Sequence, residues 1–199
     1  MRLKLICTFF VFFFVYQLSA QQLSSDSTLK TPPLRNFYLG AGTGLNGPSG
    51  LAGIFVNYRI YKFVHLNAGT GLSLWGFRHS IGAEIDANPV KGGGVGIGYS
   101  YSTGFDSINL SISNGKSSTV RVMQLYPTKT INLTFHYKLL IFKRHYIQFY
   151  TGVASKIGTR VAGQYRILEG DPLSQDDKDA LNVMVPGGFM LGANLMLGL

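Results

Sequence analysis

Apolar and polar residues alternate with a period of two over most of the chain after residue 35. A β-strand sends successive side chains to opposite faces, so this alternation predicts strands with one apolar and one polar face. In the stretch KTINLTFHYKLLIF, Leu133 lies on the apolar face and its neighbour Asn132 on the polar face. Eight segments carry the pattern: 36–45, 51–61, 63–77, 93–102, 107–113, 129–142, 145–157 and 183–199. No helical period competes, although residues 175–183 fit either one short helix or an irregular loop.

Two kinds of barrel fit alternating strands, a soluble one with an apolar interior and a membrane one with a polar interior. The polar faces consist mostly of Gly, Ser, Thr and Asn, with few charges such as Arg59, Lys138 and Lys156. Charged residues make up 14% of the chain, which is low for a soluble exterior. The apolar faces carry no charge between their ends, as lipid requires, because a charge at mid-bilayer costs roughly 2–4 kcal/mol. We therefore predict an all-β protein, an eight-stranded antiparallel up-and-down transmembrane β-barrel spanning residues 36–199.

Loop lengths agree with such a barrel when both chain ends lie on its periplasmic side, because outer loops are then the longer ones. The predicted periplasmic turns are 61–63, 103–106 and 142–144. The predicted outer loops are 46–50, 78–92, 114–128 and 158–182. Four aromatic residues of lipid-facing parity lie near the predicted periplasmic side, namely Phe37, Tyr58, Tyr101 and Tyr137. Trp75 and Phe77 lie near the outer end but on the lumen parity.

The N-terminus has the layout of a secretory signal peptide. A short basic start precedes the apolar stretch LICTFFVFFFVY, and small residues follow up to Ala20. This stretch of 12 residues is shorter than the roughly 20 that a membrane-spanning helix needs, although an uncleaved anchor is the alternative. We predict a cleaved signal peptide over 1–20 and a flexible periplasmic lead-in over 21–35. The single cysteine, Cys7, lies before the cut, so the mature chain would contain none.

The signal ending LSAQQ, the first strand NFYLGAGTGL and the hairpin INLTFHYKLLIFKRHYIQFYTGVASKIG resemble the small outer-membrane β-barrel proteins of the PorT-like and OmpX/OmpA-like type. The resemblance covers residues 36–199 and lies in pattern more than in fixed residues. It implies an integral barrel of the bacterial outer membrane that the barrel-insertion machinery assembles. The chain departs from it at Leu199, since such barrels often end on an aromatic residue that this machinery reads.

Some barrels of this kind modify lipid A with a serine, a histidine and an acid near the outer rim. The nearest set here is His79, Ser80, Glu84 and Asp86. Residues 79 and 80 would face opposite sides of a strand, which is poor geometry for a nucleophile and its base. None of the four histidines has the spacing of a zinc-protease motif. We therefore predict no catalytic, cofactor-binding or metal-binding residues, no cofactor, and a protein that is not an enzyme.

Two further patterns favour structural explanations. The loop 158–182 holds more than half of the acids, Glu169, Asp171, Asp176, Asp177 and Asp179. Calcium would accept such oxygens, but the spacing does not match the twelve-residue calcium loop, so a solvated acidic loop is the better interpretation. Gly40, Gly42 and Gly44 lack the Lys-Ser/Thr and helix of a nucleotide-binding loop, and we interpret them as lumen-facing strand glycines.

The net charge of +9 would suit nucleic acid, but the signal peptide argues against that partner. Seven basic residues fall in or beside the predicted outer loops: Arg78, Lys91, Lys116, Arg121, Lys129, Arg160 and Arg166. They would meet the phosphates of outer-leaflet glycolipid, or they are scattered solubilising charge.

These observations favour a structural, adhesive or partner-binding role, with loops 78–92 and 158–182 as sites for a surface ligand or an envelope protein. Two alternatives use the same scaffold, a lipid-modifying enzyme and a small-solute channel. Eight strands enclose room only for side chains or one small ligand, which disfavours a general pore.

Overall fold

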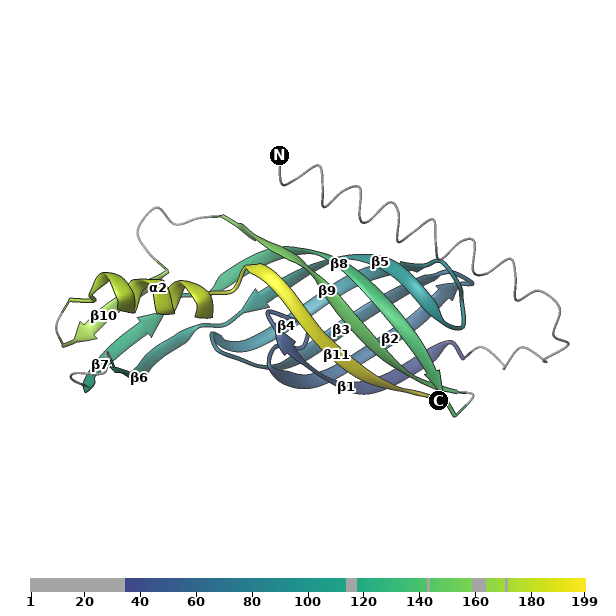
Figure 1. The fold of residues 1–199 in the computed structure, drawn as a ribbon, viewed down its shortest axis with the longest axis horizontal. Helices are drawn as coiled ribbons and strands as arrows, with labels where there is room; N and C mark the ends of the chain where they lie inside the picture. The colour runs from purple at the N-terminus through teal and green to yellow at the C-terminus, as the bar shows by residue number, and fades with distance from the viewer. Residues whose placement is uncertain (1–34, 114–117, 143, 159–163, 171) are drawn as a thin grey trace, which may run out of the picture. The chain divides into compact units, whose positions relative to one another are not determined.

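Eight antiparallel strands of the chain close into a barrel (Figure 1). The computed structural model describes residues 35–113, 118–142, 144–158, 164–170 and 172–199, so the predicted signal peptide and all but the last residue of the lead-in lie outside it. The barrel strands are β1 (Phe37–Leu45), β2 (Ala52–Tyr61), β3 (Val64–Ser73), β4 (Gly76–Asp86), β5 (Gly92–Ser102), β8 (Thr128–Ile141), β9 (His145–Ile157) and β11 (Gly188–Gly198). Strand β1 pairs with β11 from Tyr38–Gly198 to Leu45–Leu191, which leaves the barrel without a free edge. The predicted eight-stranded antiparallel barrel is confirmed.

The strands run alternately between two ends of the barrel. We call the end with the turns 62–63, 87–91 and 142–144 the near end. Both termini of the barrel lie there, and the Leu199 N–H donates to the Phe37 carbonyl at 3.1 Å. The connections 46–51, 74–75, 103–127 and 158–187 lie at the opposite end, which we call the far end. As predicted, the longest connections gather at the end away from the termini.

The number of barrel strands was predicted correctly, but one of the eight predicted segments is not a barrel strand. Residues 63–77 do not form one strand, because β3 ends at Ser73 and a two-residue turn leads into β4. The Ser73 hydroxyl donates to the Gly76 carbonyl at 2.9 Å, and Gly76 has φ +85°, a conformation that glycine adopts without strain. The predicted outer loop 78–92 is therefore mostly barrel wall, and its remainder, 87–91, lies at the near end. The predicted strand 107–113 is not part of the barrel.

A second, smaller sheet occupies the two longest far-end connections, residues 103–127 and 158–187, which we call the extension. Its strands are β6 (Phe105–Ser113), β7 (Ser118–Leu125) and β10 (Tyr165–Glu169), in the order β10-β7-β6. The turn predicted at 103–106 on the periplasmic side is thus wrong, since it lies at the far end. The predicted strand 107–113 took the place of β4 in the predicted barrel, so the predicted direction of the later strands was still correct.

The extension has its own apolar core beneath helix α2 (Gln175–Met184). Of the two interpretations of 175–183, the helix is correct. Ser174 caps the helix, because its hydroxyl accepts from the Asp177 N–H at 3.2 Å while the Asp177 carboxylate accepts from the Ser174 N–H at 3.0 Å. The core residues are Trp75, Leu125 and Val185 in one cluster and Met123, Leu173 and Leu181 in another. Among the described residues no helix is both long and apolar enough to cross a membrane.

The barrel is polar inside and apolar outside. On β8, Leu133 is 47% exposed whereas its neighbour Asn132 is 3% exposed. On β2, Ile54 is exposed and Asn57 is fully buried. Gly44 faces inward as predicted, and a Cβ there would overlap the Tyr150 hydroxyl. The predicted assignment of faces is confirmed for these strands.

Two predicted placements are wrong. Phe77 is exposed, not in the lumen, because the turn at 74–75 resets the parity of β4. Tyr101 lies at the far end, because β5 runs toward that end. Lys156 has the predicted lumen parity, since it pairs with buried Thr130, but it lies at the far rim of β9, where it is exposed and its ammonium donates to the Gln164 side chain at 3.0 Å.

Candidate functional site

The near half of the barrel lumen holds a network of buried charges centred on Asp86, at the end of β4. The His136 Nε2 lies 2.7 Å from one Asp86 carboxylate oxygen, and the His65 Nε2 lies 2.8 Å from the other. The Lys138 ammonium donates to both oxygens at 2.9 Å. Strands β3 and β8 thus place side chains on a carboxylate of β4, because each strand sends every second residue inward.

Glu84, two residues before Asp86 on β4, forms the second centre of the network. The Gln148 amide donates to its two carboxylate oxygens at 3.1 and 3.0 Å, and the Asn67 amide donates to one of them at 3.0 Å. Lys138 lies 3.4 Å from Glu84 and so joins the two carboxylates. The guanidinium of Arg59 donates to the Pro89 carbonyl at 2.8 Å.

Within this network the Lys138 ammonium is the permanent cation that contacts both carboxylates. A packed cluster of Tyr38, Phe55, Tyr146 and Met196 lies buried in the same half of the barrel. Polar networks and packed aromatics together fill the space that eight strands enclose. This filling argues against an open passage through the near half.

Glu84, Asp86 and His136 place one potential metal-ligating atom each within 4.8 Å of one another. A divalent ion would suit two carboxylates and an imidazole. However, the Lys138 ammonium contacts both carboxylates and already supplies the positive charge there. The donor set therefore does not fit a divalent cation while Lys138 remains charged, and we assign no metal to it.

The structure does not assemble the rim residues that a lipid-modifying enzyme would need. His79 is exposed on the outer face of β4, and its Nδ1 lies 2.9 Å from the Thr70 hydroxyl. Ser80 lies on the opposite face and contacts the Gly69 carbonyl at 3.5 Å. Glu84 and Asp86 lie at the other end of the strand, where they belong to the buried charge network around Asp86. The expectation that 79 and 80 diverge was correct, whereas their placement in an outer loop was wrong.

The acidic loop is partly a helix cap. Asp177 is buried, and the Arg121 guanidinium lies 3.1 Å from its carboxylate. Burial raises the pKa of Asp177, but its bonds with Ser174 and the charge of Arg121 outweigh burial and lower the pKa below the usual value. Glu169, Asp176 and Asp179 are exposed, and Asp171 lies outside the described residues.

The seven predicted outer-loop cations divide into several groups. Lys129 and Arg166 are exposed at or beside the far end, as predicted. Arg121 is buried against Asp177, and Lys91 lies in a near-end turn. Lys116 and Arg160 lie outside the described residues. Arg78 points into the lumen, not into an outer loop as predicted.

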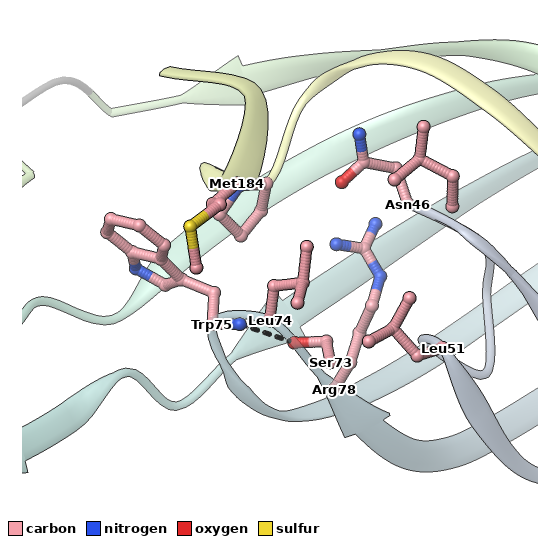
Figure 2. A pocket seen from close by; sticks show the side chains of 9 residues that line it. Asn46, Leu51, Ser73, Leu74, Trp75, Arg78 and Met184 are labelled. Atoms are coloured by element: carbon pink, nitrogen blue, oxygen red, sulfur yellow. Dashed lines mark hydrogen bonds between the residues drawn. The ribbon is translucent and has the colours of Figure 1, made fainter. Parts of the chain in front are cut away.

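A small cavity lies where the far end of the barrel meets the extension (Figure 2). Ser73, Leu74, Trp75 and Arg78 line it from the β3–β4 hairpin, and Met184 lines it from α2. The Trp75 indole N–H donates to the Tyr126 carbonyl at 2.8 Å, which ties the hairpin to the extension. The glycine after Trp75 was the only sequence signal of this hairpin.

Neither protein-family models nor the sequences of characterised proteins match this chain. Among solved structures, the chain is similar to the N-terminal β-barrel domain of OprF from Pseudomonas aeruginosa. The TM-score is 0.42 and the sequence identity 13%, and the match covers 82% of this chain and 97% of that one.

Proposed function

We propose that this protein is an integral β-barrel of the bacterial outer membrane whose extension binds a surface ligand or an envelope partner. The observation that carries the membrane assignment is the reversed polarity of the barrel, with buried Asn, Gln and charged residues inside and exposed Leu and Ile outside. A soluble barrel would expose this apolar surface to water, which monomeric soluble proteins avoid over areas of this kind. Lipid removes that cost.

Exposed aromatic residues flank the apolar surface at both ends, as expected at membrane–water interfaces. At the near end these include Phe37, Tyr58 and Tyr137. At the far end Phe77 of β4 and Phe189 of β11 are exposed on opposite sides of the barrel. The sequence pattern indicated this far-end group of aromatic residues only weakly, because β4, which carries Phe77, was not predicted as a barrel strand.

The extension supports a binding role because its own folded structure fixes the positions of its exposed residues. It contains a three-stranded sheet, a capped helix and an apolar core, none of which barrel closure requires. Ligand-binding residues usually lie on loops that a rigid scaffold holds in position. Exposed Val120, Leu168 and Arg166 offer apolar and cationic contacts on it. Exposed Lys129 on the adjacent rim would meet glycolipid phosphates.

The alternatives have less support. The packed network around Asp86 argues against a small-solute channel, and the divergence of His79 and Ser80 argues against a rim enzyme of serine–histidine type. A non-enzymatic role remains our proposal.

Cysteine labelling on intact cells tests the membrane assignment and its direction. The mature chain is predicted to lack cysteine, so single Val120→Cys and Lys91→Cys variants report the far and near ends. A membrane-impermeant maleimide should label Val120→Cys on intact cells and Lys91→Cys only after the outer membrane is permeabilised. Labelling of both without permeabilisation, or of neither variant after it, would contradict the assignment, and the reverse pattern would place the extension in the periplasm.

Removal of the extension tests the binding role. Ser102 pairs with Thr128 and Ala154 pairs with Gly188, so a short Gly/Ser turn can join β5 to β8 and another β9 to β11. All eight barrel strands remain, and we expect a heat-modifiable barrel that has lost binding to lipopolysaccharide vesicles or to whichever envelope partner cross-links to the intact protein. Unchanged cross-linking and vesicle binding would place recognition on the barrel itself.

A further inference from the structure

Arg78 is a buried cation with no carboxylate partner in the part of the chain that the structure describes. Its side chain belongs to a residue only 1% exposed. One terminal nitrogen lies 3.5 Å from the Ser102 hydroxyl and the other 3.2 Å from the Thr130 hydroxyl, and its Nε has no hydrogen-bond partner. Both partners are neutral.

The acids of the lumen lie too far away to balance this charge. Glu84 and Asp86 follow Arg78 on the same strand, toward the near end, and by the rise of a strand their Cα atoms lie about 20 Å or more from that of Arg78. Both are already paired with Lys138. Because a guanidinium cannot release its proton, the cost of burying this charge calls for an anion close to it.

The cavity of the far end lies beside this guanidinium. The centre of a water-sized sphere can occupy about 10 Å³ of this cavity, which leaves room for one small species. Figure 2 shows the Arg78 side chain extending into the space between Leu51, Leu74 and Asn46. The Asn46 amide donates to the Gly187 carbonyl at 2.8 Å and to the Phe189 carbonyl at 3.2 Å, which holds this wall of the cavity to the start of β11.

We propose that this cavity binds one monovalent anion of halide size against the Arg78 guanidinium. The apolar walls lower the local dielectric constant and strengthen the attraction between the two charges. A guanidinium is more weakly hydrated than an ammonium, so less hydration is lost when it holds a small anion there. We take a single-atom anion as the occupant because the cavity is small. The site requires only the folded barrel and its extension, so it does not depend on the proposed function.

Trp75 is the reporter for the test, because it is the only tryptophan of the chain and lines the same cavity. Iodide quenches tryptophan fluorescence on contact, and Trp75 is fully buried, so a neutral quencher such as acrylamide should have little effect. In the full mature protein folded in detergent, at constant ionic strength, we expect saturable quenching by iodide that chloride reverses. Arg78→Gln should lose the saturable component, whereas Arg166→Gln, which removes an exposed cation, should retain it.

Linear quenching with the same slope in wild type and Arg78→Gln would overturn the proposal. Reversal by acetate but not by chloride would also overturn it, in favour of a carboxylate ligand. If Arg78→Gln does not fold, crystals of the wild-type protein soaked in bromide decide the question. An anomalous peak beside the Arg78 guanidinium supports the site, and its absence contradicts it.

Discussion

The exposed face of β8 offers the sharpest test of the membrane assignment. Leu133 is 47% exposed and pairs with Ile97 and Val153, which are also exposed. It lies four residues from Lys129, which pairs with Tyr101, and four residues from Tyr137. At about 3.3 Å per step and a tilt of about 40°, the eight steps from Lys129 to Tyr137 cover roughly 20 Å of membrane, with Leu133 in the middle.

Leu133→Arg should therefore place a charge near the bilayer midplane. The expected cost is about 2–4 kcal/mol, or about 30-fold to several hundred-fold in the folding equilibrium. Val120→Arg is the matched control, since Val120 is a strand residue of comparable chemistry, 61% exposed, but on the extension. Its expected effect is within about 0.5 kcal/mol.

Urea titration of both variants in lipid vesicles, followed by gel migration with and without boiling, measures this difference. Trp75 fluorescence provides an independent signal in the same samples. Equal unfolding midpoints for Leu133→Arg and Val120→Arg would refute the reasoning, because the exposed apolar face would then not be in contact with lipid.

Three further predictions concern other parts of the chain. N-terminal sequencing of the exported protein should begin at Gln21, and a sequence beginning at Met1 would contradict the signal peptide. Lys138→Met should destabilise the barrel by about 3–5 kcal/mol in the same urea titration, because it leaves two buried carboxylates without their shared cation, whereas Lys129→Met on the outer face should have little effect. The lowered pKa of Asp177 means that its carboxylate stabilises α2 above the unfolded pKa of about 3.9, and that this contribution is lost as the pH falls through the folded value. The hydrogen-exchange protection factors of α2, which correct for the intrinsic rate at each pH, should therefore fall below about pH 4 in the wild type, while Asp177→Asn should show no such dependence.

Strand periodicity determined most of the barrel without any tertiary information. The polar face of 129–142 was assigned from sequence, and the structure buries Asn132, His136 and Lys138 in the lumen as expected. This works because each strand sends alternate residues to two very different surroundings. The composition of the two faces, small and polar against aliphatic, then indicated which one lies inside.

Pairing and turn geometry were decided only by the tertiary structure. Residues 63–77 and the residues after them alternate almost continuously, so a two-residue hairpin centred on Leu74 and Trp75 leaves little trace in the pattern. Its conformation depends on Gly76 and on hydrogen bonds of Ser73 that form only when β3 and β4 pair. Strand β6 alternates as a barrel strand does, yet it pairs with β7 in the extension.

The two charged sites of the lumen, the network around Asp86 and the buried Arg78, also could not be predicted from the sequence. His65, Asp86 and Lys138 come from three strands, and their meeting depends on the register of the pairs β3–β4, β4–β5 and β5–β8. Arg78 was assigned to a loop because the hairpin before it was missed. The alternation of the sequence determines which face of a strand a residue occupies. Its partners on that face depend on strand order and stagger, which only the closed barrel determines.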